Sequence, residues 1–231
     1  MKKQLLLAVS FIISTVTIAQ LKKATLKTAA KQPSFGVRAG LISSNLTGDA
    51  VNSLQGILNY SNGMVSSASR TGFFAGTYAT IPIDNLLSVE PGIYYSQRGY
   101  ELNGQLNLKG AEFAGVNAKA KLNADYLDVP LLLKATIDGL QLFAGPQISY
   151  LMKADLQTTA GLLGFNLLNT NMDATSQFNR LDVGVTAGIG YRVANGFNIM
   201  AAYDHGLSKM DANRNLDSYN RSFKFGVGLN F

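Results

Sequence analysis

The feature that most constrains the fold of this chain is the recurrence of apolar residues at every second position, from Phe35 to the end of the sequence. A period of two is that of a β-strand, in which successive side chains point to opposite faces of a sheet. Residues 127–137 and 180–193 both follow this pattern. In the last segment, polar residues and glycines alternate with five apolar residues: Phe223, Phe225, Val227, Leu229 and Phe231. The chain is therefore predicted to be all-β.

Eight segments of this kind are predicted as strands: residues 34–47, 71–83, 87–102, 124–137, 140–156, 177–193, 197–209 and 219–231. Three connections are tight turns built from Asp, Asn and Gly, which tolerate the backbone angles required there: 84–85, 138–139 and 195–196. They alternate with four long polar connections: 48–70, 103–123, 157–176 and 206–218. Short turns at one end and long loops at the other are typical of outer-membrane β-barrels.

The two faces of these strands differ in composition. One face carries Leu, Val, Ile, Phe and Tyr with no charge in its middle, and the other carries Gly, Ser, Thr and a few charges. Because an eight-stranded barrel is just wide enough for side chains to fill, the small polar face fits the interior and the apolar face fits lipid. Phe74 and Tyr78 are exceptions that are predicted to point inward. Five aromatic residues are expected on the outer face or near strand ends, as a girdle: Tyr95, Tyr150, Tyr191, Tyr203 and Phe231. The prediction is an eight-stranded antiparallel up-and-down transmembrane β-barrel.

The first 33 residues differ from the rest. Lys2 and Lys3 precede an apolar stretch, residues 5–18, that ends at Ala19, which predicts a cleaved secretory signal peptide over residues 1–19. The alternatives are an anchoring helix or a buried first helix. A flexible basic arm, 20–33, is predicted to precede the barrel domain, 34–231. Lysines of the leader and arm account for the whole net charge of +6, because the remaining 14 basic residues match the 14 acidic ones. A nucleic-acid partner is therefore not expected.

Two segments carry a resemblance to a known family, residues 88–95 (SVEPGIYY) and 126–132 (YLDVPLL), together with a last strand that ends in Phe231. Over residues 34–231 the chain resembles the outer-membrane β-barrel family of the Bacteroidota, the PorT-like barrels. The resemblance implies a protein of the Gram-negative outer membrane, surrounded by lipid. One relative in that family is tied to protein secretion and gliding, but most have no assigned role, so no specific task follows. Phe231 also resembles the aromatic end by which the barrel-assembly machinery recognises its clients.

No catalytic, metal or cofactor site is predicted. His205 is the only histidine and has Asp204 beside it, but neighbours on a strand face opposite ways and cannot easily share a proton. The chain has no cysteine, which excludes thiol nucleophiles and zinc–thiolate sites, and no EF-hand spacing occurs. Gly184, Gly188 and Gly190 lie in the middle of a predicted strand and do not form a dinucleotide-binding loop.

Charged residues on the predicted inner face form a more promising group. The seven are Arg38, Glu90, Asp128, Lys134, Asp182, Arg192 and Lys224. Four further charges are expected nearer the loop ends: Arg98, Lys153, Arg180 and Asp204. A lone charge in a closed interior is costly, so we expect a salt-bridged core that holds the barrel shut. The alternative is a path for protons or ions.

The long connection 157–176 contains an apolar stretch that is unusual for an external loop. Its apolar residues are Leu162, Leu163, Phe165, Leu167 and Leu168. Exposed apolar patches often mark contact sites, so these residues are candidate contacts for a protein partner. Alternatively, the stretch packs over the barrel mouth or folds back along its own strands.

These observations favour a non-enzymatic outer-membrane barrel that is structural or docks a partner through its long extracellular loops. A second hypothesis is a barrel enzyme of the protease or acyl transferase type, for which His205, Asp204 and Asp211 lie in a suitable region. A third is a secreted soluble β-barrel that binds a small apolar ligand.

Overall fold

The computed structural model describes residues 32–48, 64–108, 111–162, 165–210 and 218–231. The predicted signal peptide, 1–19, and nearly all of the predicted arm, 20–33, lie outside the described residues. The residues described belong to one compact unit, Lys31–Phe231. Among them, no helix is long and apolar enough to span a membrane.

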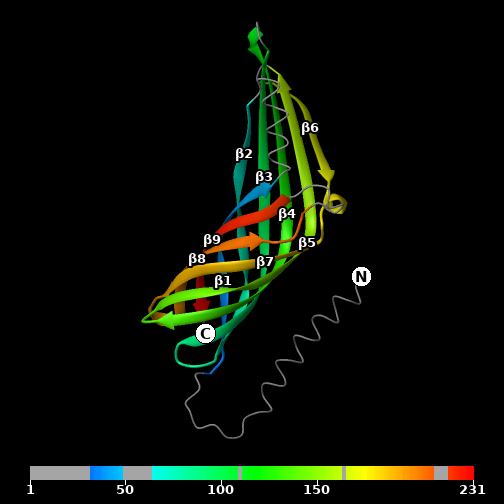
Figure 1. Cartoon of the computed structure of the whole chain (residues 1–231). Helices are drawn as coiled ribbons and strands as arrows, with labels where there is room; N and C mark the ends of the chain where they lie inside the picture. The colour runs from blue at the N-terminus through cyan, green and yellow to red at the C-terminus, as the bar shows by residue number, and fades with distance from the viewer. Residues whose placement is uncertain (1–31, 49–63, 109–110, 163–164, 211–217) are drawn as a thin grey trace. The chain divides into compact units, whose positions relative to one another are not determined.

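The described chain is almost entirely β-structure (Figure 1). The strands are β1 (Ser34–Gly48), β2 (Met64–Pro82), β3 (Leu87–Leu108), β4 (Ala111–Ile137), β5 (Leu140–Leu162), β6 (Phe165–Asp173), β7 (Leu181–Arg192), β8 (Phe197–Gly206) and β9 (Ser218–Asn230). Two single-turn 3₁₀ helices, η1 (Thr175–Gln177) and η2 (Ala194–Gly196), connect β6 to β7 and β7 to β8.

The strands close into a ring of antiparallel neighbours. The order is β4-β3-β2-β1-β9-β8-β7-β5, and the pairing of β4 with β5 completes the circle. The first and last strands meet along their length, where Gly36 pairs with Asn230 and Gly48 with Ser218. The backbone N–H of Phe231 donates to the carbonyl of Phe35 at 2.8 Å. The predicted eight-stranded antiparallel barrel is confirmed.

A ninth strand, β6, lies where the sequence predicts part of the loop 157–176. The outer half of β5 pairs with β6, from Asp155↔Asp173 to Leu162↔Phe165, and its inner half pairs with β7. Both β6 and β7 lie on the same edge of β5, so together they occupy one position in the ring. The predicted start of a strand at residue 177 is wrong, because that residue belongs to η1 and β7 begins at Leu181.

Several strands are also longer than predicted. Residues 103–108 continue β3 and residues 111–123 belong to β4, although the sequence predicts a loop over 103–123. The start of β2 lies at Met64, seven residues before the predicted start at residue 71. These segments consist largely of polar and small residues and have no continuous apolar face. The two-residue period therefore disappears from the sequence even though the backbone pairing continues.

Asp84 and Asn85 lie in a bend between β2 and β3 and have no positive φ, whereas the other two predicted tight turns agree with the prediction. Asp138 and Gly139 have φ angles of 48° and 90°, and Asn195 and Gly196 have 63° and 83°. Positive φ at both central residues is the requirement of the hairpin turn that follows the natural twist of the strands, and Asp, Asn and Gly adopt it most readily. These turns join β4 to β5 and β7 to β8, which fixes the register of both hairpins.

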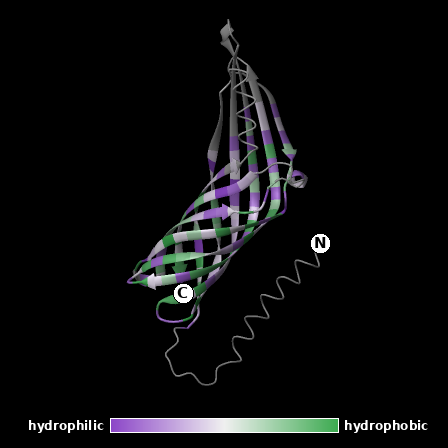
Figure 2. Ribbon diagram, viewed as in Figure 1, coloured by the Kyte–Doolittle hydropathy of each residue, from purple (hydrophilic) through white to green (hydrophobic). Residues whose placement is uncertain are grey.

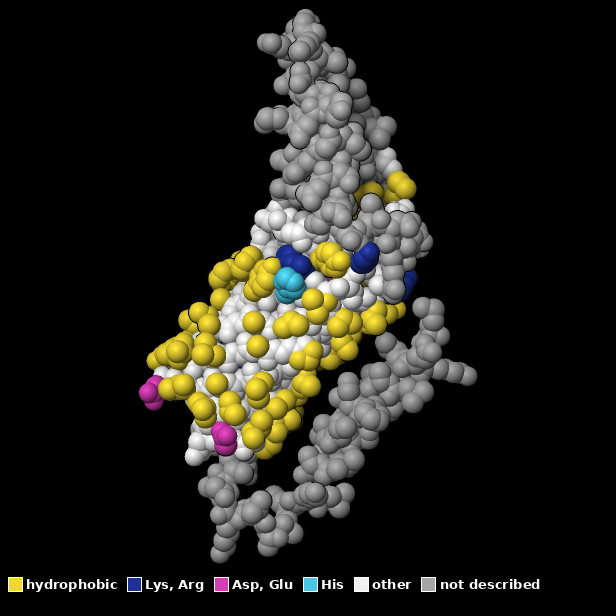
Figure 3. Space-filling model, viewed as in Figure 1, with side chains coloured by type: hydrophobic (Ala, Val, Ile, Leu, Met, Phe, Trp, Pro, Cys, Tyr) yellow, Lys and Arg dark blue, Asp and Glu magenta, His cyan; other side chains and the backbone are white. Residues whose placement is uncertain are grey.

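The polar face of the barrel points inward, as predicted. On β9, Phe225 points outward and is 61% exposed, whereas its sequence neighbour Lys224 points inward and is 6% exposed. Figure 2 shows apolar and polar residues alternating along the lower strands, and Figure 3 shows the apolar side chains spread over the outer surface. Among the predicted girdle residues, Tyr191 and Phe231 are exposed, and Tyr95, Tyr150 and Tyr203 are half-buried. Phe74 and Tyr78 point inward and are buried.

Glycines on the inner face make room for these large inner rings. A Cβ atom built on Gly226 would lie 2.7 Å from Cζ of Phe74, and one built on Gly36 would lie 2.5 Å from Cζ of Tyr78. Neither distance is compatible with normal packing. The glycine-rich inner face is thus matched to the aromatic rings that fill the barrel.

Candidate functional site

The barrel interior contains eight buried charged side chains among the described residues. They are Arg38, Glu90, Arg98, Asp128, Lys134, Asp182, Asp204 and Lys224. Four are cations and four are anions, so the set is neutral when all are ionised. This balance matters because an uncompensated buried charge is costly.

Six of the seven residues predicted for the inner charge network belong to this set, and one does not. Arg192 lies on the same strand face as Asp182, but at the turn end of β7, where it is exposed to solvent. Arg98 and Asp204, predicted nearer the loop ends, are instead buried within the set. The strands around Arg98 continue well beyond it, so a position that resembles the barrel mouth in the sequence lies inside the barrel.

Arg38, Glu90 and Lys134 form the first ion cluster. Nη1 of Arg38 donates to Oε1 of Glu90 at 2.8 Å, and Nζ of Lys134 donates to the other carboxylate oxygen. The same Nη1 lies 3.1 Å from the hydroxyl of Tyr94, and the guanidinium lies 4.1 Å from the ring centroid of Tyr78. One carboxylate thus joins cations from β1 and β4, with aromatic rings packed around them.

Arg98, Asp128, Asp182, Asp204 and Lys224 form the second ion cluster. Asp128 is fully buried and accepts from Nη2 of Arg98 at 2.7 Å and from Nζ of Lys224 at 3.2 Å. Lys224 also lies 2.7 Å from Asp204, and Nη1 of Arg98 lies 3.8 Å from Asp182. The pairs Lys224–Asp128 (β9 to β4) and Arg98–Asp182 (β3 to β7) cross the interior between strands that are not neighbours in the ring.

Neutral side chains also donate hydrogen bonds to the carboxylates of the second ion cluster. Each carboxylate accepts a hydrogen bond of 2.8 Å from one of them: Ser96 for Asp128, Thr186 for Asp204 and Asn220 for Asp182. Charge-assisted hydrogen bonds of this length are among the stronger interactions in proteins.

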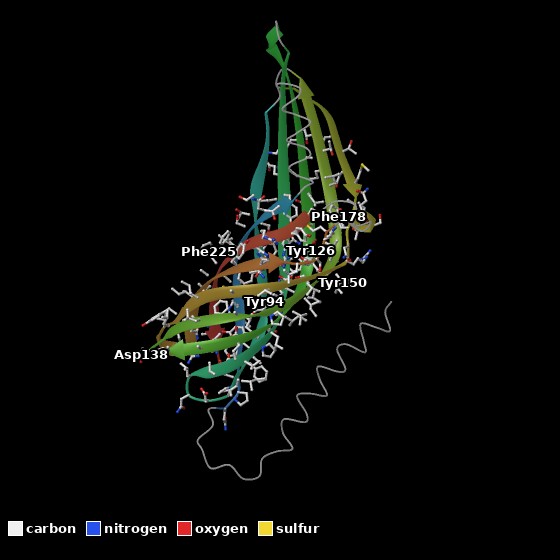
Figure 4. The ribbon with its side chains drawn as sticks, in the orientation of Figure 1. Tyr94, Tyr126, Asp138, Tyr150, Phe178 and Phe225 are labelled. Atoms are coloured by element: carbon white, nitrogen blue, oxygen red, sulfur yellow. The ribbon has the colours of Figure 1, made fainter. Side chains whose placement is uncertain are left out.

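Apolar layers separate and cap the two clusters. Phe74 and Tyr94 pack edge to face with ring centroids 6.1 Å apart, and Phe74 contacts Lys224 whereas Tyr94 contacts Arg38. Beyond the second cluster lies a larger apolar group: Tyr100, Leu122, Ala124, Tyr126, Leu151, Ala154 and Met210. Figure 4 shows Tyr94 and Tyr126 inside the ring at different levels. Side chains therefore fill the interior in alternating ionic and apolar layers.

The arrangement offers no dyad for proton transfer at His205. His205 is exposed on the outer surface, whereas Asp204 is buried and paired with Lys224, as the alternation of a strand requires. Within the described residues, no group of three His, Cys, Asp or Glu side chains is placed to hold a metal ion. Gly184, Gly188 and Gly190 lie within β7.

The described part of the predicted apolar contact segment belongs to the adjoining ends of β5 and β6. Leu162 pairs with Phe165, and Ala160 pairs with Leu168, so the backbone folds back along β5. Leu167 belongs to β6, and Leu163 lies outside the described residues. The backbone pairing agrees with the alternative that this stretch folds along its own strands.

A closed antiparallel ring with an apolar outer face and a charge-balanced polar interior defines the class of transmembrane β-barrels. Residues 18–212 match the family model of the outer membrane protein beta-barrel domain, and the chain belongs to this family. The protein is therefore an outer-membrane protein.

Similar solved structures include other outer-membrane proteins. Ail of Yersinia pestis is 12% identical, covers 87% of this chain and 100% of its own, and has a TM-score of 0.45. OprG of Pseudomonas aeruginosa is 14% identical, covers 87% of this chain and 97% of its own, and has a TM-score of 0.43. Neisserial surface protein A is 14% identical, covers 87% of this chain and 100% of its own, and has a TM-score of 0.42. No curated protein matches the chain.

Proposed function

We propose that the protein is a non-enzymatic outer-membrane barrel that docks a protein partner through β-hairpins projecting from its loop end. The observation that carries this proposal is strand length. The strands β3, β4 and β5 contain 22, 27 and 23 residues, whereas about 9–11 residues are enough to cross a bilayer. Half or more of each strand is therefore available outside the membrane as a paired sheet.

The β5–β6 hairpin is the part of this sheet best suited to contact a partner. Residues 169–173 of β6 are all exposed, so both faces of this strand are accessible. The apolar residues that precede them supply the contact surface that we propose: Leu162, Leu163, Phe165, Leu167 and Leu168. A strand in a paired hairpin holds its side chains more rigidly than a loop, which lowers the entropy lost on binding.

The interior supports a non-enzymatic role. In the described part of the chain, its buried charged groups are engaged in ion pairs with one another. The only histidine of the chain faces outward, away from the buried carboxylates. A barrel enzyme needs an acid, a base and a nucleophile that a substrate can reach, and the carboxylates of the second ion cluster are buried and paired with cations.

Three finer features belong to the same proposal. The chain is a PorT-like barrel of the Bacteroidota, it is exported by a signal peptide over residues 1–19, and the barrel-assembly machinery recognises its last strand. The exposed terminal Phe231 supports the last of these. The mature protein should begin at Gln20, which mass determination of the N-terminal peptide from isolated outer membranes would test. An uncleaved Met1 in that material would contradict export by a cleaved leader.

Photo-cross-linking in intact cells tests the docking role directly. A photoreactive amino acid at the exposed position Asn171 of β6 should yield a discrete cross-linked protein, since this strand projects toward the partner. The same amino acid at Val227, on the apolar outer face, serves as a matched control and should capture no such protein. Absence of any protein adduct from Asn171 and from the other exposed positions of β6 would contradict docking.

A further inference from the structure

Three polar side chains form a row on the outer surface of the barrel, at the ends of β1, β9 and β8 nearest the loops. Asn45 pairs with Arg221, and Arg221 pairs with His205 across the next ladder. All three face outward; Asn45 and His205 are exposed and Arg221 is half-buried. Neighbouring strands are about 4.8 Å apart, so three hydrogen-bond donors lie side by side.

The row lies at the outer edge of the apolar band. Along β9, every outward residue from Phe223 to Phe231 is apolar, and these nine positions match the length needed to cross a bilayer. Arg221 is the next outward residue toward the loops. Beneath the row, the rings of Tyr203 and Phe223 are 4.8 Å apart, and Tyr203 lies 6.0 Å from the ring of His205. Aromatic rings mark the interface between hydrocarbon and headgroups.

Figure 3 shows the same placement on the surface. The histidine side chain lies next to Lys and Arg side chains, along the upper edge of the apolar area. Because long loops lie on the outer side of such barrels, this edge faces the headgroups of the outer leaflet.

Arg221 is held in position for binding. Its Nη1 donates to the carbonyl of Gly206 at 2.6 Å and to the carbonyl of Asn220 at 2.9 Å. Its guanidinium carbon lies 5.7 Å from the ring centroid of Tyr219. Nε and Nη2 carry three further N–H groups, and a guanidinium binds phosphate oxygens through such groups in pairs.

The charges around the row favour an anion. Arg221 is charged and stands directly opposite His205, so both side chains can donate hydrogen bonds to one ligand. Their outward neighbours in the rows above and below are uncharged: Ser43, Thr47, Tyr203, Leu207, Tyr219 and Phe223. We propose that Asn45, Arg221 and His205 bind the phosphate group of an outer-leaflet lipid, whose acyl chains lie against the apolar band below.

Lipid A and the same lipid after enzymatic removal of its phosphates provide a matched pair of probes. The full-length mature barrel in detergent is titrated with each lipid, and the bound fraction is measured by native mass spectrometry. The phosphorylated lipid should bind at least about tenfold more tightly, since hydrogen bonds to charged groups are stronger than those between neutral groups. Equal affinity for the two lipids would overturn the proposal.

Variants assign the affinity to the row. R221Q combined with H205Q should weaken lipid A binding about tenfold or more, and Asn45→Ala should weaken it by a smaller factor. Lys153→Gln, an exposed cation on β5, is the matched control and should leave binding unchanged. An unchanged affinity in the double variant would contradict the assignment. A loss of affinity is attributed to the row only where the variant has the same unfolding midpoint as the unchanged protein. Because the three residues lie on the surface, we expect the midpoint to stay the same.

Inorganic phosphate distinguishes a lipid site from a site for any soluble anion. Because the row lies at headgroup depth, free phosphate should not displace lipid A. Displacement at millimolar concentrations would mean that the lipid is not the ligand.

Discussion

At the scale of single residues, Asp128 joins two cations of the second ion cluster. It is fully buried and accepts bonds from Arg98, Lys224 and Ser96. Asp128→Asn removes the negative charge but keeps the size, so two buried cations lose their shared partner. We expect a loss of about 3–5 kcal/mol in the free energy of unfolding. Denaturant titration of the refolded barrel in micelles measures it.

The control for this prediction is an ion pair on the surface. Lys153 is 57% exposed and pairs with Asp155 at 2.6 Å. Exposed pairs contribute less than about 1 kcal/mol, so Lys153→Met should change the unfolding midpoint little. Equal midpoints for Asp128→Asn and the unchanged protein would show that the buried network does not hold the barrel together.

The pairing of Phe74 with Gly226 gives a second prediction at this scale. Gly226→Ala places a methyl group 2.7 Å from Cζ of Phe74, and overpacking of this kind costs about 1–3 kcal/mol. Phe74→Leu replaces the ring by a shorter side chain. It should recover part of that loss when it is combined with Gly226→Ala. The double-mutant cycle is measured by unfolding. Additive losses would mean that the ring and the glycine do not compete for the same space.

The alternation in the sequence predicted the facing of individual residues well but not their depth in the barrel. Glu90 and Lys134 are buried where the pattern places them, because the parity of a strand fixes which way a side chain points. Arg192 lies on the same face of β7 as the buried residues, but it is the last residue of the strand and is exposed to solvent. Arg98 was placed too near the mouth, because depth depends on strand ends that the polar extensions conceal.

At the scale of elements, the turn between β2 and β3 depends on one carboxylate. Oδ1 of Asp84 accepts from the backbone N–H groups of Leu87 and Leu86, each at 2.7 Å. These bonds favour the ionised form and hold the pKa of Asp84 below its ordinary value of 3.8. Since the folded-state pKa lies below the unfolded one, this stabilisation is present above the ordinary value. It is lost as the pH falls through the folded-state pKa.

Asp84→Ala should therefore lower the stability of the barrel near neutral pH, and the difference from the unchanged protein should shrink below about pH 4. Unfolding midpoints of both proteins at a series of pH values measure the difference. A gap that stays constant down to about pH 3 would show that the Asp84 carboxylate does not stabilise the turn through these bonds.

Strands and turns could be predicted where apolar alternation or turn-forming residues mark them in the sequence, and not elsewhere. The turn at 138–139 has a clear chemical signal, because Asp and Gly adopt positive φ. The ninth strand, β6, has no such signal: its sequence reads as a polar loop with a few apolar residues, and backbone pairing with β5 alone defines it. The same holds for residues 111–123 of β4. Long-range pairing of this kind is not visible in a local pattern.

At the scale of the whole molecule, an even number of strands in the ring allows the first and last strands to pair antiparallel, but it does not predict the layered interior. The sequence supplies both signs of charge on the inner face. Which cation meets which anion depends on the stagger of strands on opposite sides of the ring, as for Lys224 and Asp128. The resulting interior, ionic clusters separated by aromatic layers, leads to the central claim that the barrel is closed.

Conductance tests this claim most directly. The refolded protein is inserted into planar bilayers and into liposomes loaded with a small sugar. Eight strands leave an interior that side chains can fill, whereas aqueous channels are found at about 16–18 strands. The bilayers should therefore show no steady conductance steps, and the liposomes should retain their sugar. Large, steady conductance steps or rapid release of the sugar would contradict a closed interior.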